Sequence, residues 1–116
     1  MLAEPRPGGA LIPGTLDLLI LKALSRGKAH GYAVAEWIHD VSEETLFVEE
    51  GALYPALHRL ELAGLLESEW GRSDTNRRVK FYRLTRGGRK SLETERKRWR
   101  ALAAGMSRVL DFGEVR

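Results

Sequence analysis

The sequence predicts a mainly α-helical protein with a small β-hairpin. Three stretches with helical spacing of apolar residues come first, within residues 15–63. Two strand-like runs follow, over residues 65–70 and 77–84, and a polar loop over 71–76 separates them. A long helical pattern over residues 85–110 comes last. Three helices followed by a hairpin is the order of a winged helix-turn-helix, here with an added C-terminal helix.

The first helix is expected to begin at Thr15, a favourable N-cap residue after Pro13-Gly14. The run Arg26-Gly27-Lys28 is typical of a helix end, because glycine follows the last turn and basic side chains suit its negative pole. The apolar face of this helix consists of Leu16, Leu19, Ile20, Ala23 and Leu24.

The second helix is expected over residues 30–41, where apolar residues repeat the same spacing at Val34, Trp37, Ile38 and Val41. The short run over residues 45–48 is rich in β-formers. It is typical either of a turn into the next helix or of a minor strand.

The third helix is expected over residues 50–63. Pro55 is placed in its first turn, where a missing N–H costs little. Gly64 indicates its end. The residues expected on its buried face are Leu53, Ala56, Leu57 and Leu60.

The last helix is capped by Thr85 and has a heptad-like apolar seam. Leu92, Trp99 and Met106 recur every seven residues, and Leu102 and Val109 lie three positions beyond the last two. So short a seam is marginal alone, which favours packing against a second subunit. We therefore expect a flexible arm over residues 1–10, a winged helix-turn-helix domain over 11–84, and a dimerisation helix with a tail over 85–116.

Composition and charge limit the classes of function that fit this sequence. The 116 residues suit one domain, and the absence of cysteine excludes disulfides and thiolate chemistry. The apolar segment over residues 16–24 is too short to span a bilayer, so a soluble, cytoplasmic protein is expected. Although the net charge is only +3, residues 72–100 contain twelve basic residues against three acidic ones. Such a cluster favours a nucleic acid partner over an ordinary solvated surface.

The outward face of the third helix contains the candidate base-reading residues Tyr54, His58 and Arg59. A helix in this position lies in the major groove of DNA, and only Arg59 could grip guanine bidentately. The alternatives are solvent exposure of His58, packing of Tyr54 on Pro55 or the hairpin, and pairing of Arg59 with Glu61 or Glu36. The hairpin residues expected to contact phosphates are Arg72, Arg77, Arg78 and Lys80, and a solvated turn is the alternative.

Other chemistry finds little support in the sequence. Three histidines without cysteine give no metal-ligand spacing, and no cofactor is expected. Gly87-Gly88 lacks the spacing of a phosphate-binding loop, so an enzyme is not expected. Two alternatives to DNA binding stay open. One is a winged helix that binds other proteins through its acidic first half, and the other is RNA binding, for which stacking aromatics are not evident.

The combination of motifs resembles the PadR-like family of transcriptional regulators over residues 11–110. The motifs are Leu16-Asp17-Leu18-Leu19-Ile20-Leu21, His30-Gly31-Tyr32, Gly51-Ala52-Leu53-Tyr54-Pro55-Ala56-Leu57-His58-Arg59-Leu60-Glu61, Gly64-Leu65-Leu66 and Tyr82-Arg83-Leu84-Thr85-Arg86-Gly87-Gly88. The resemblance implies a repressor that binds inverted-repeat, double-stranded DNA as a homodimer. It also implies that the last helix forms the dimer.

The resemblance further implies site residues. Tyr54, Pro55, His58 and Arg59 match the family's recognition-helix motif, and Tyr32 matches a position near phosphate. Some members hold a small aromatic ligand between subunits, stacked on a tryptophan of the last helix, and Trp99 stands at a similar place. A tryptophan at a seam position is more often core, so both roles of Trp99 stay open.

Overall fold

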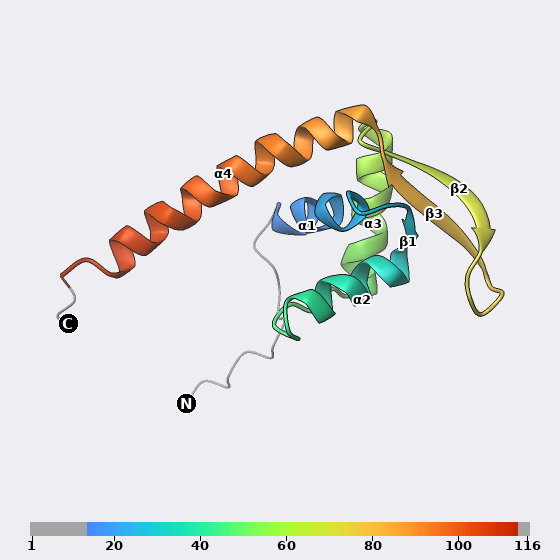
Figure 1. The fold of residues 1–116 in the computed structure, drawn as a ribbon, viewed down its shortest axis with the longest axis horizontal. Helices are drawn as coiled ribbons and strands as arrows, with labels where there is room; N and C mark the ends of the chain where they lie inside the picture. Colours follow the sequence, from blue (N-terminus) through green and yellow to red (C-terminus); the bar gives the residue numbers. More distant parts are fainter. Residues whose placement is uncertain (1–13, 114–116) are drawn as a thin grey trace.

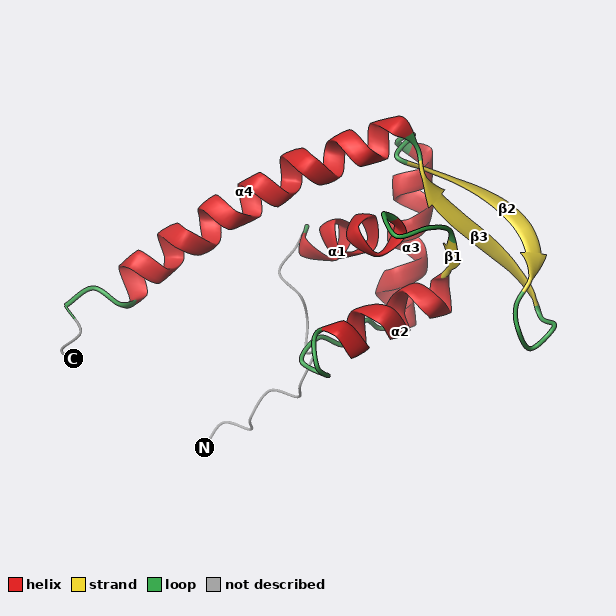
Figure 2. Cartoon of the chain, viewed as in Figure 1, coloured by secondary structure: helices red, strands yellow, loops and turns green. Residues whose placement is uncertain are grey.

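The computed structural model describes residues 14–113, and the arm and tail expected at the two ends fall largely outside this range. Within this range the chain forms four helices and a three-stranded antiparallel sheet (Figures 1 and 2). In chain order, the elements are α1 (Thr15–Leu24), β1 (Ala29–His30), α2 (Gly31–Val41), α3 (Glu50–Leu62), β2 (Leu66–Arg72), β3 (Arg78–Leu84) and α4 (Arg86–Leu110).

Helix α1 lies at the centre of the fold, between α4 and α2 and against α3 (Figure 1). Its residues Ile20, Leu21 and Leu24 are fully buried, as are Leu53 and Leu57 of α3. The predicted buried face of α3 is confirmed in full, because helical periodicity alone selects those positions. The core around them also contains Val34, Ile38, Val48, Ala56, Leu60, Leu66, Tyr82, Leu84 and Leu92.

The helix starts differ in how they are capped. Thr15 is the first residue of α1 rather than its N-cap; Gly14 takes the cap position with φ 91°, a left-handed conformation that glycine adopts at little cost. His30 caps α2, since its Nδ1 accepts a hydrogen bond from the Ala33 amide at 3.3 Å. Val41, predicted on the buried face of α2, is exposed because the helix ends there.

Strand β1 was not predicted from the sequence, because two residues are too few to show the alternation typical of a strand. Ala29 pairs with Tyr82 and His30 with Phe81, so β3 lies between β1 and β2. The β-rich run over residues 45–48 forms no strand. Instead the Ser42 hydroxyl accepts a hydrogen bond from the Leu46 amide at 3.0 Å, and the chain turns directly into α3.

Helix α3 ends as predicted at Gly64, which adopts φ 80°. The amide of Leu65 donates to the carbonyl of Leu60, and that of Gly64 to the carbonyl of Glu61, both at 3.0 Å. This pair of bonds is a Schellman motif. Pro55 lies inside the helix rather than in its first turn, six residues after the N-cap Glu49, so its missing N–H removes one internal hydrogen bond.

Helix α4 begins at a tightly bonded junction with the end of α3. The Thr85 hydroxyl accepts from the Gly88 amide at 3.0 Å, the predicted cap, and donates to the Gly64 carbonyl at 2.6 Å. Beyond Leu92 the helix extends away from the rest of the protein (Figure 1). Leu92 was assigned to the dimer seam, but it is only 6% exposed and packs in the core of its own chain. No helix within residues 14–113 is long and apolar enough to cross a membrane.

Candidate nucleic-acid interface

The start of α2, the first half of α3 and the hairpin enclose an open cleft of about 670 Å³. Tyr32 and Tyr54 line it from the helices, and both are substantially exposed. Arg77 and Lys80 line it from the hairpin. The cleft therefore combines aromatic and basic side chains on the face where a winged helix meets DNA.

Gly31 explains why Tyr54 lies where it does. A Cβ built at Gly31 would lie 2.7 Å from a ring carbon of Tyr54, which is closer than real contacts allow. Glycine at this position therefore lets the Tyr54 ring pack over the start of α2. Together with the cap by His30, this contact gives the tripeptide His30-Gly31-Tyr32 a physical role: it ends β1, starts α2 and leaves room for the Tyr54 ring.

The register of the hairpin places a basic and aromatic cluster on its inner face. Trp70 pairs with Lys80, and Arg72 pairs with Arg78, so all four side chains point to the same side of the sheet. The Arg78 guanidinium lies 4.2 Å from the centre of the Trp70 ring, and the Lys80 ammonium lies 5.7 Å from it. These cation–π contacts hold both cations beside the cleft.

A polar network connects the hairpin to α3. Glu61 accepts a hydrogen bond from the Ser68 hydroxyl at 2.6 Å and lies 3.7 Å from the Lys80 ammonium. Burial, together with the Glu61 carboxylate and Tyr54, raises the pKa of the Tyr82 hydroxyl. On the outer face of the sheet, the hydrogen bond from Arg83 to Glu67 at 2.7 Å raises the pKa of Arg83.

Arg59 points to a different flank of α3 from Tyr54. Five residues separate them, which is about 140° around a helix, whereas His58 lies one turn after Tyr54 on the same side. The Arg59 guanidinium forms an ion pair with Asp17 of α1 at 2.6 Å, and neither Glu61 nor Glu36 is its partner. Of the predicted contact residues, Tyr32, Tyr54, Arg77 and Lys80 line the cleft. Those that do not are Pro55, His58, Arg59, Arg72 and Arg78.

Trp70 is a residue of this face that the sequence analysis overlooked. It is 56% exposed and lines the cleft between its two cation partners. The alternation of β3 indicates that Lys80 and Arg78 lie on the inner face of the hairpin, because they share the face of buried Tyr82. Only the register, however, identifies Trp70 as their neighbour. Three acidic residues, Glu36, Glu50 and Asp74, also line the cleft. Within residues 14–113, no three potential metal ligands lie close enough together to hold a metal ion.

Comparison with known proteins agrees with this geometry. Residues 20–94 match the Transcriptional regulator PadR-like family. This chain belongs to the PadR-like family. The family consists of transcription regulators rather than enzymes, and membership supports DNA binding as the activity of this winged helix.

Three relatives illustrate the match. Transcriptional regulator Rv3488 of Mycobacterium tuberculosis is 38% identical over 87 residues, which cover 74% of this chain and 77% of that protein. A PadR family regulator from Clostridium difficile R20291 is 33% identical, with a TM-score of 0.71 over 84% of this chain and 99% of that one. A regulator from Clostridium thermocellum is 29% identical, with a TM-score of 0.75 over 87% and 95% of the two chains. The winged-helix fold predicted for this PadR-like protein is thereby confirmed.

Proposed function

We propose that this PadR-like protein is a cytoplasmic transcriptional repressor that binds an inverted-repeat operator as a homodimer. The observation that carries the proposal is the cleft, because it brings the tyrosines of α2 and α3 beside the cations of the hairpin. Helix α3 enters the major groove and reads bases through Tyr54, His58 and Arg59. The hairpin residues Arg72, Arg77, Arg78 and Lys80 bind phosphates and supply affinity, as does Tyr32 at the start of α2.

Base reading by Arg59 requires that it leave Asp17. The Arg59 side chain is 60% exposed and that of Asp17 is 30% exposed, so the pair remains open to solvent. Pairs at a solvent-exposed surface contribute about 0–1 kcal/mol. A bidentate contact with guanine discriminates between bases by about 1–3 kcal/mol. A guanine contact of that size outweighs the pair with Asp17, so Arg59 can exchange Asp17 for a base.

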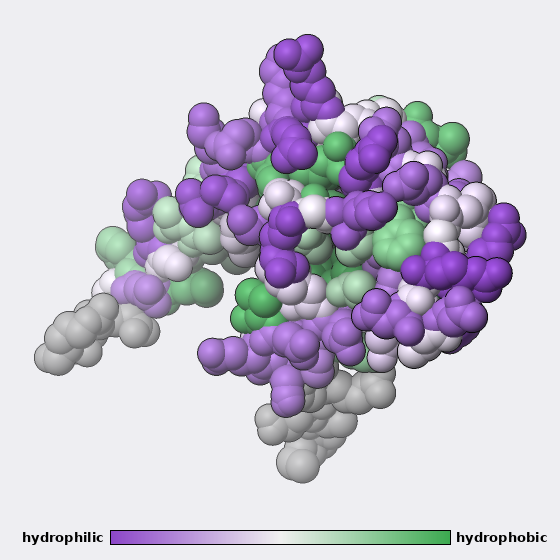
Figure 3. Space-filling model, turned by 45° about the vertical axis from the view of Figure 1, so that its right-hand side comes forward, coloured by the Kyte–Doolittle hydropathy of each residue, from purple (hydrophilic) through white to green (hydrophobic). Residues whose placement is uncertain are grey.

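The exposed seam of α4 supports the homodimer. Trp99, Leu102, Met106 and Val109 are 40–77% exposed, although they are large apolar side chains. Figure 3 shows apolar side chains gathered toward the free end of α4. Pairing with a second copy covers them, and a two-fold dimer presents its two α3 helices to successive major grooves about one turn of DNA apart.

The proposal includes release by a small aromatic effector that stacks on Trp99 between the subunits. Trp99 is 40% exposed, so part of its ring is accessible for stacking. Tryptophan fluorescence titrated with a panel of planar aromatics tests this role. A response that persists unchanged in the Trp99→Phe variant would come from Trp37 or Trp70 and would place Trp99 in the core instead.

Selection of bound duplexes from a random pool tests the DNA proposal directly. We expect a palindromic consensus whose half-sites lie about one helical turn apart. The binding constant should also fall steeply between low and moderate salt, because phosphate contacts release counterions. No enrichment, together with a flat salt response, would mean that the winged helix binds protein instead. Reduced transcription from a promoter that contains the selected site, on addition of the protein, tests repression.

A further inference from the structure

Helix α4 has a larger net positive charge than the protein as a whole. Between Arg86 and Leu110 there are eight basic residues and two acidic ones, whereas the whole chain has a net charge of only +3. The remainder of the chain is therefore net acidic. A dimer seam needs none of this charge, since its contacts are apolar.

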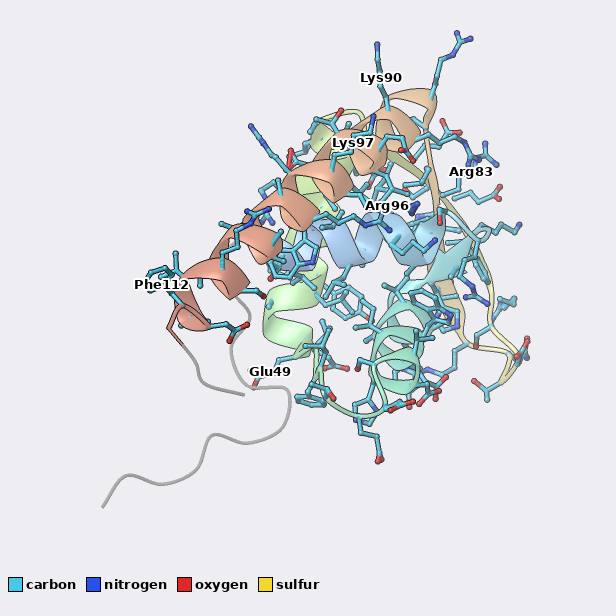
Figure 4. The ribbon with its side chains drawn as sticks, turned by 60° about the vertical axis from the view of Figure 1, so that its left-hand side comes forward. Glu49, Arg83, Lys90, Arg96, Lys97 and Phe112 are labelled. Atoms are coloured by element: carbon cyan, nitrogen blue, oxygen red, sulfur yellow. The ribbon has the colours of Figure 1, made fainter. Side chains whose placement is uncertain are left out.

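Six of these cations form one stripe along the helix, which we call the α4 basic stripe. At about 100° per residue, they fall within an arc of about 100° on the side opposite Leu92, Leu102 and Met106. Its members are Arg86, Arg89, Lys90, Lys97, Arg100 and Arg108. Glu93 is the one acidic residue within the arc. In Figure 4, Lys90 points outward from α4 on the side away from α1.

The stripe is exposed and unneutralised. All six side chains are exposed, and within residues 14–113 none of them forms an ion pair with a carboxylate. In the DNA-binding domain, Lys28, Arg59, Lys80 and Arg83 each lie against a carboxylate. Of the described cations there, Arg72, Arg77 and Arg78 of the hairpin are exposed and form no ion pair with a carboxylate, like those of the stripe. The described surface therefore has two groups of cations suited to a polyanion, the hairpin beside the cleft and the α4 basic stripe.

The shape and chemistry of the stripe favour double-stranded DNA as that polyanion. It spans 22 residues of helix, about 33 Å, which is close to one turn of B-DNA. The other side chains within the arc are Glu93, Ala104 and Ser107. The face therefore has neither the aromatics that stack single-stranded bases nor the apolar anchors typical of protein interfaces. Cations alone match a phosphate backbone.

The stripe also lies away from the cleft. In Figure 1, α4 runs along one edge of the molecule, while α2 and the tip of the hairpin lie toward the opposite edge. A duplex seated on α3 and the hairpin therefore leaves the stripe free. We propose that the α4 basic stripe binds the phosphate backbone of a second DNA duplex, without sequence preference, so that the protein bridges two DNA segments.

A capture assay with the full chain tests this proposal. Immobilised duplex carrying the selected operator is saturated with protein at about 50 mM salt, and a labelled duplex of random sequence is then added. The double variant Lys90→Gln, Lys97→Gln should capture about tenfold less random duplex, because two phosphate contacts are lost, while its affinity for the operator stays within about twofold.

A matched control removes the same charge elsewhere. Lys22 of α1 and Arg98, which pairs with Glu95, lie outside the stripe, and their double replacement by Gln lowers the net charge equally. This control should capture random duplex like the unchanged protein. An equal loss of capture in both variants would show that only overall charge matters and would overturn the proposal. Unchanged capture by the stripe variant would overturn it as well.

The bridging proposal rests on the function proposed for the cleft, because a second duplex presupposes a first, but the two can fail separately. If the unchanged protein fails to recognise any operator but binds random duplex through Lys90 and Lys97, the stripe remains a DNA-binding surface and the operator proposal falls. If the operator is bound and no second duplex is captured, the stripe proposal falls alone.

Discussion

Gly31 is a single residue whose missing side chain shapes the candidate interface. In the variant Gly31→Ala, the new methyl group would meet the Tyr54 ring, which is partly exposed and can rotate away. We expect stability to change by no more than about 1 kcal/mol, because alanine also favours the helix. Affinity for the selected operator should fall, because Tyr54 no longer lies over the start of α2. Binding titrations and thermal unfolding measure the two effects.

A double-mutant cycle provides the control. In a Tyr54→Ala background the clash is absent, so adding Gly31→Ala should lower operator affinity no further. Gly51→Ala in α3 is a second control, because no atom lies within 4 Å of its added Cβ. It should raise stability by about 0.5–1 kcal/mol. Additive losses in the cycle would show that Gly31 acts through something other than Tyr54.

Arg59 and Asp17 give a second residue-scale prediction. Arg59→Ala should weaken operator binding by about 1–3 kcal/mol and relax the preference at one base pair. Asp17→Asn removes the partner of Arg59 and should leave operator binding unchanged or slightly stronger, with stability altered by less than about 1 kcal/mol. Competition between operator and random duplex measures both. A loss of operator binding in Asp17→Asn equal to that in Arg59→Ala would make the ion pair structural.

At this scale the sequence predicts side chains better than their partners. Tyr32, Tyr54, Arg77 and Lys80 are identified by their type and by the elements that contain them, and the fold brings them together. The partner of Arg59 is 42 residues away in sequence, so no local pattern indicates it. Trp70 is missed for a similar reason, because its place between two cations depends on a strand register that only folding sets.

The junction between α3 and α4 makes a prediction about an element boundary. A Cβ at Gly88 would lie 2.1 Å from the backbone carbonyl oxygen of Leu65, which cannot rotate away, whereas one at Gly87 meets nothing closer than 3.6 Å. Gly88→Ala should therefore cost about 1–3 kcal/mol or more, and Gly87→Ala should be neutral or stabilising. Denaturant unfolding of the two variants compares them directly. Equal stabilities would mean that α4 can shift away from the Leu65 backbone at no cost in free energy.

The hairpin gives the other prediction at this scale. Replacing Arg77 and Arg78 with Ala should weaken binding to all duplexes alike and reduce the salt slope by about 2, because two phosphate contacts are lost. Arg83→Ala is the matched control, since Arg83 lies on the outer face of the sheet and pairs with Glu67. Its salt slope should stay unchanged. A loss confined to the selected operator would show that the hairpin reads bases.

Elements with several turns of regular spacing are predicted well from sequence. All four helices appear within a few residues of their expected bounds, because burial of one face imposes a period of 3.6. Strand β1 has two residues and therefore no period to detect. Leu92 shows a different limit: the heptad spacing places it in the seam, but nothing in that spacing tells whether its neighbours belong to the same chain or to another.

At the scale of the whole molecule, the prediction concerns the subunit number. A glutamate at Leu102 or Met106 should produce monomers, because it buries an unpaired charge in the proposed interface. Ala104→Glu is the control, since Ala104 lies on the opposite side of α4. Light scattering should report a dimer for the control and a monomer for the variants. A dimer that persists in all three variants would show that the interface lies elsewhere than on the α4 face that contains Leu102 and Met106.

The hydrogen bonds of Thr85 have a mechanical consequence for such a dimer. They fasten the first turn of α4 to the last turn of α3, with the backbone of Gly88 in close approach to that of Leu65. In the proposed dimer, the helix that contacts the partner and the helix that contacts DNA are thereby rigidly coupled. We expect a change in the angle between the two α4 helices to move the two α3 helices apart or together. The proposal therefore implies that the spacing of operator half-sites is set at a junction that contacts neither DNA nor partner.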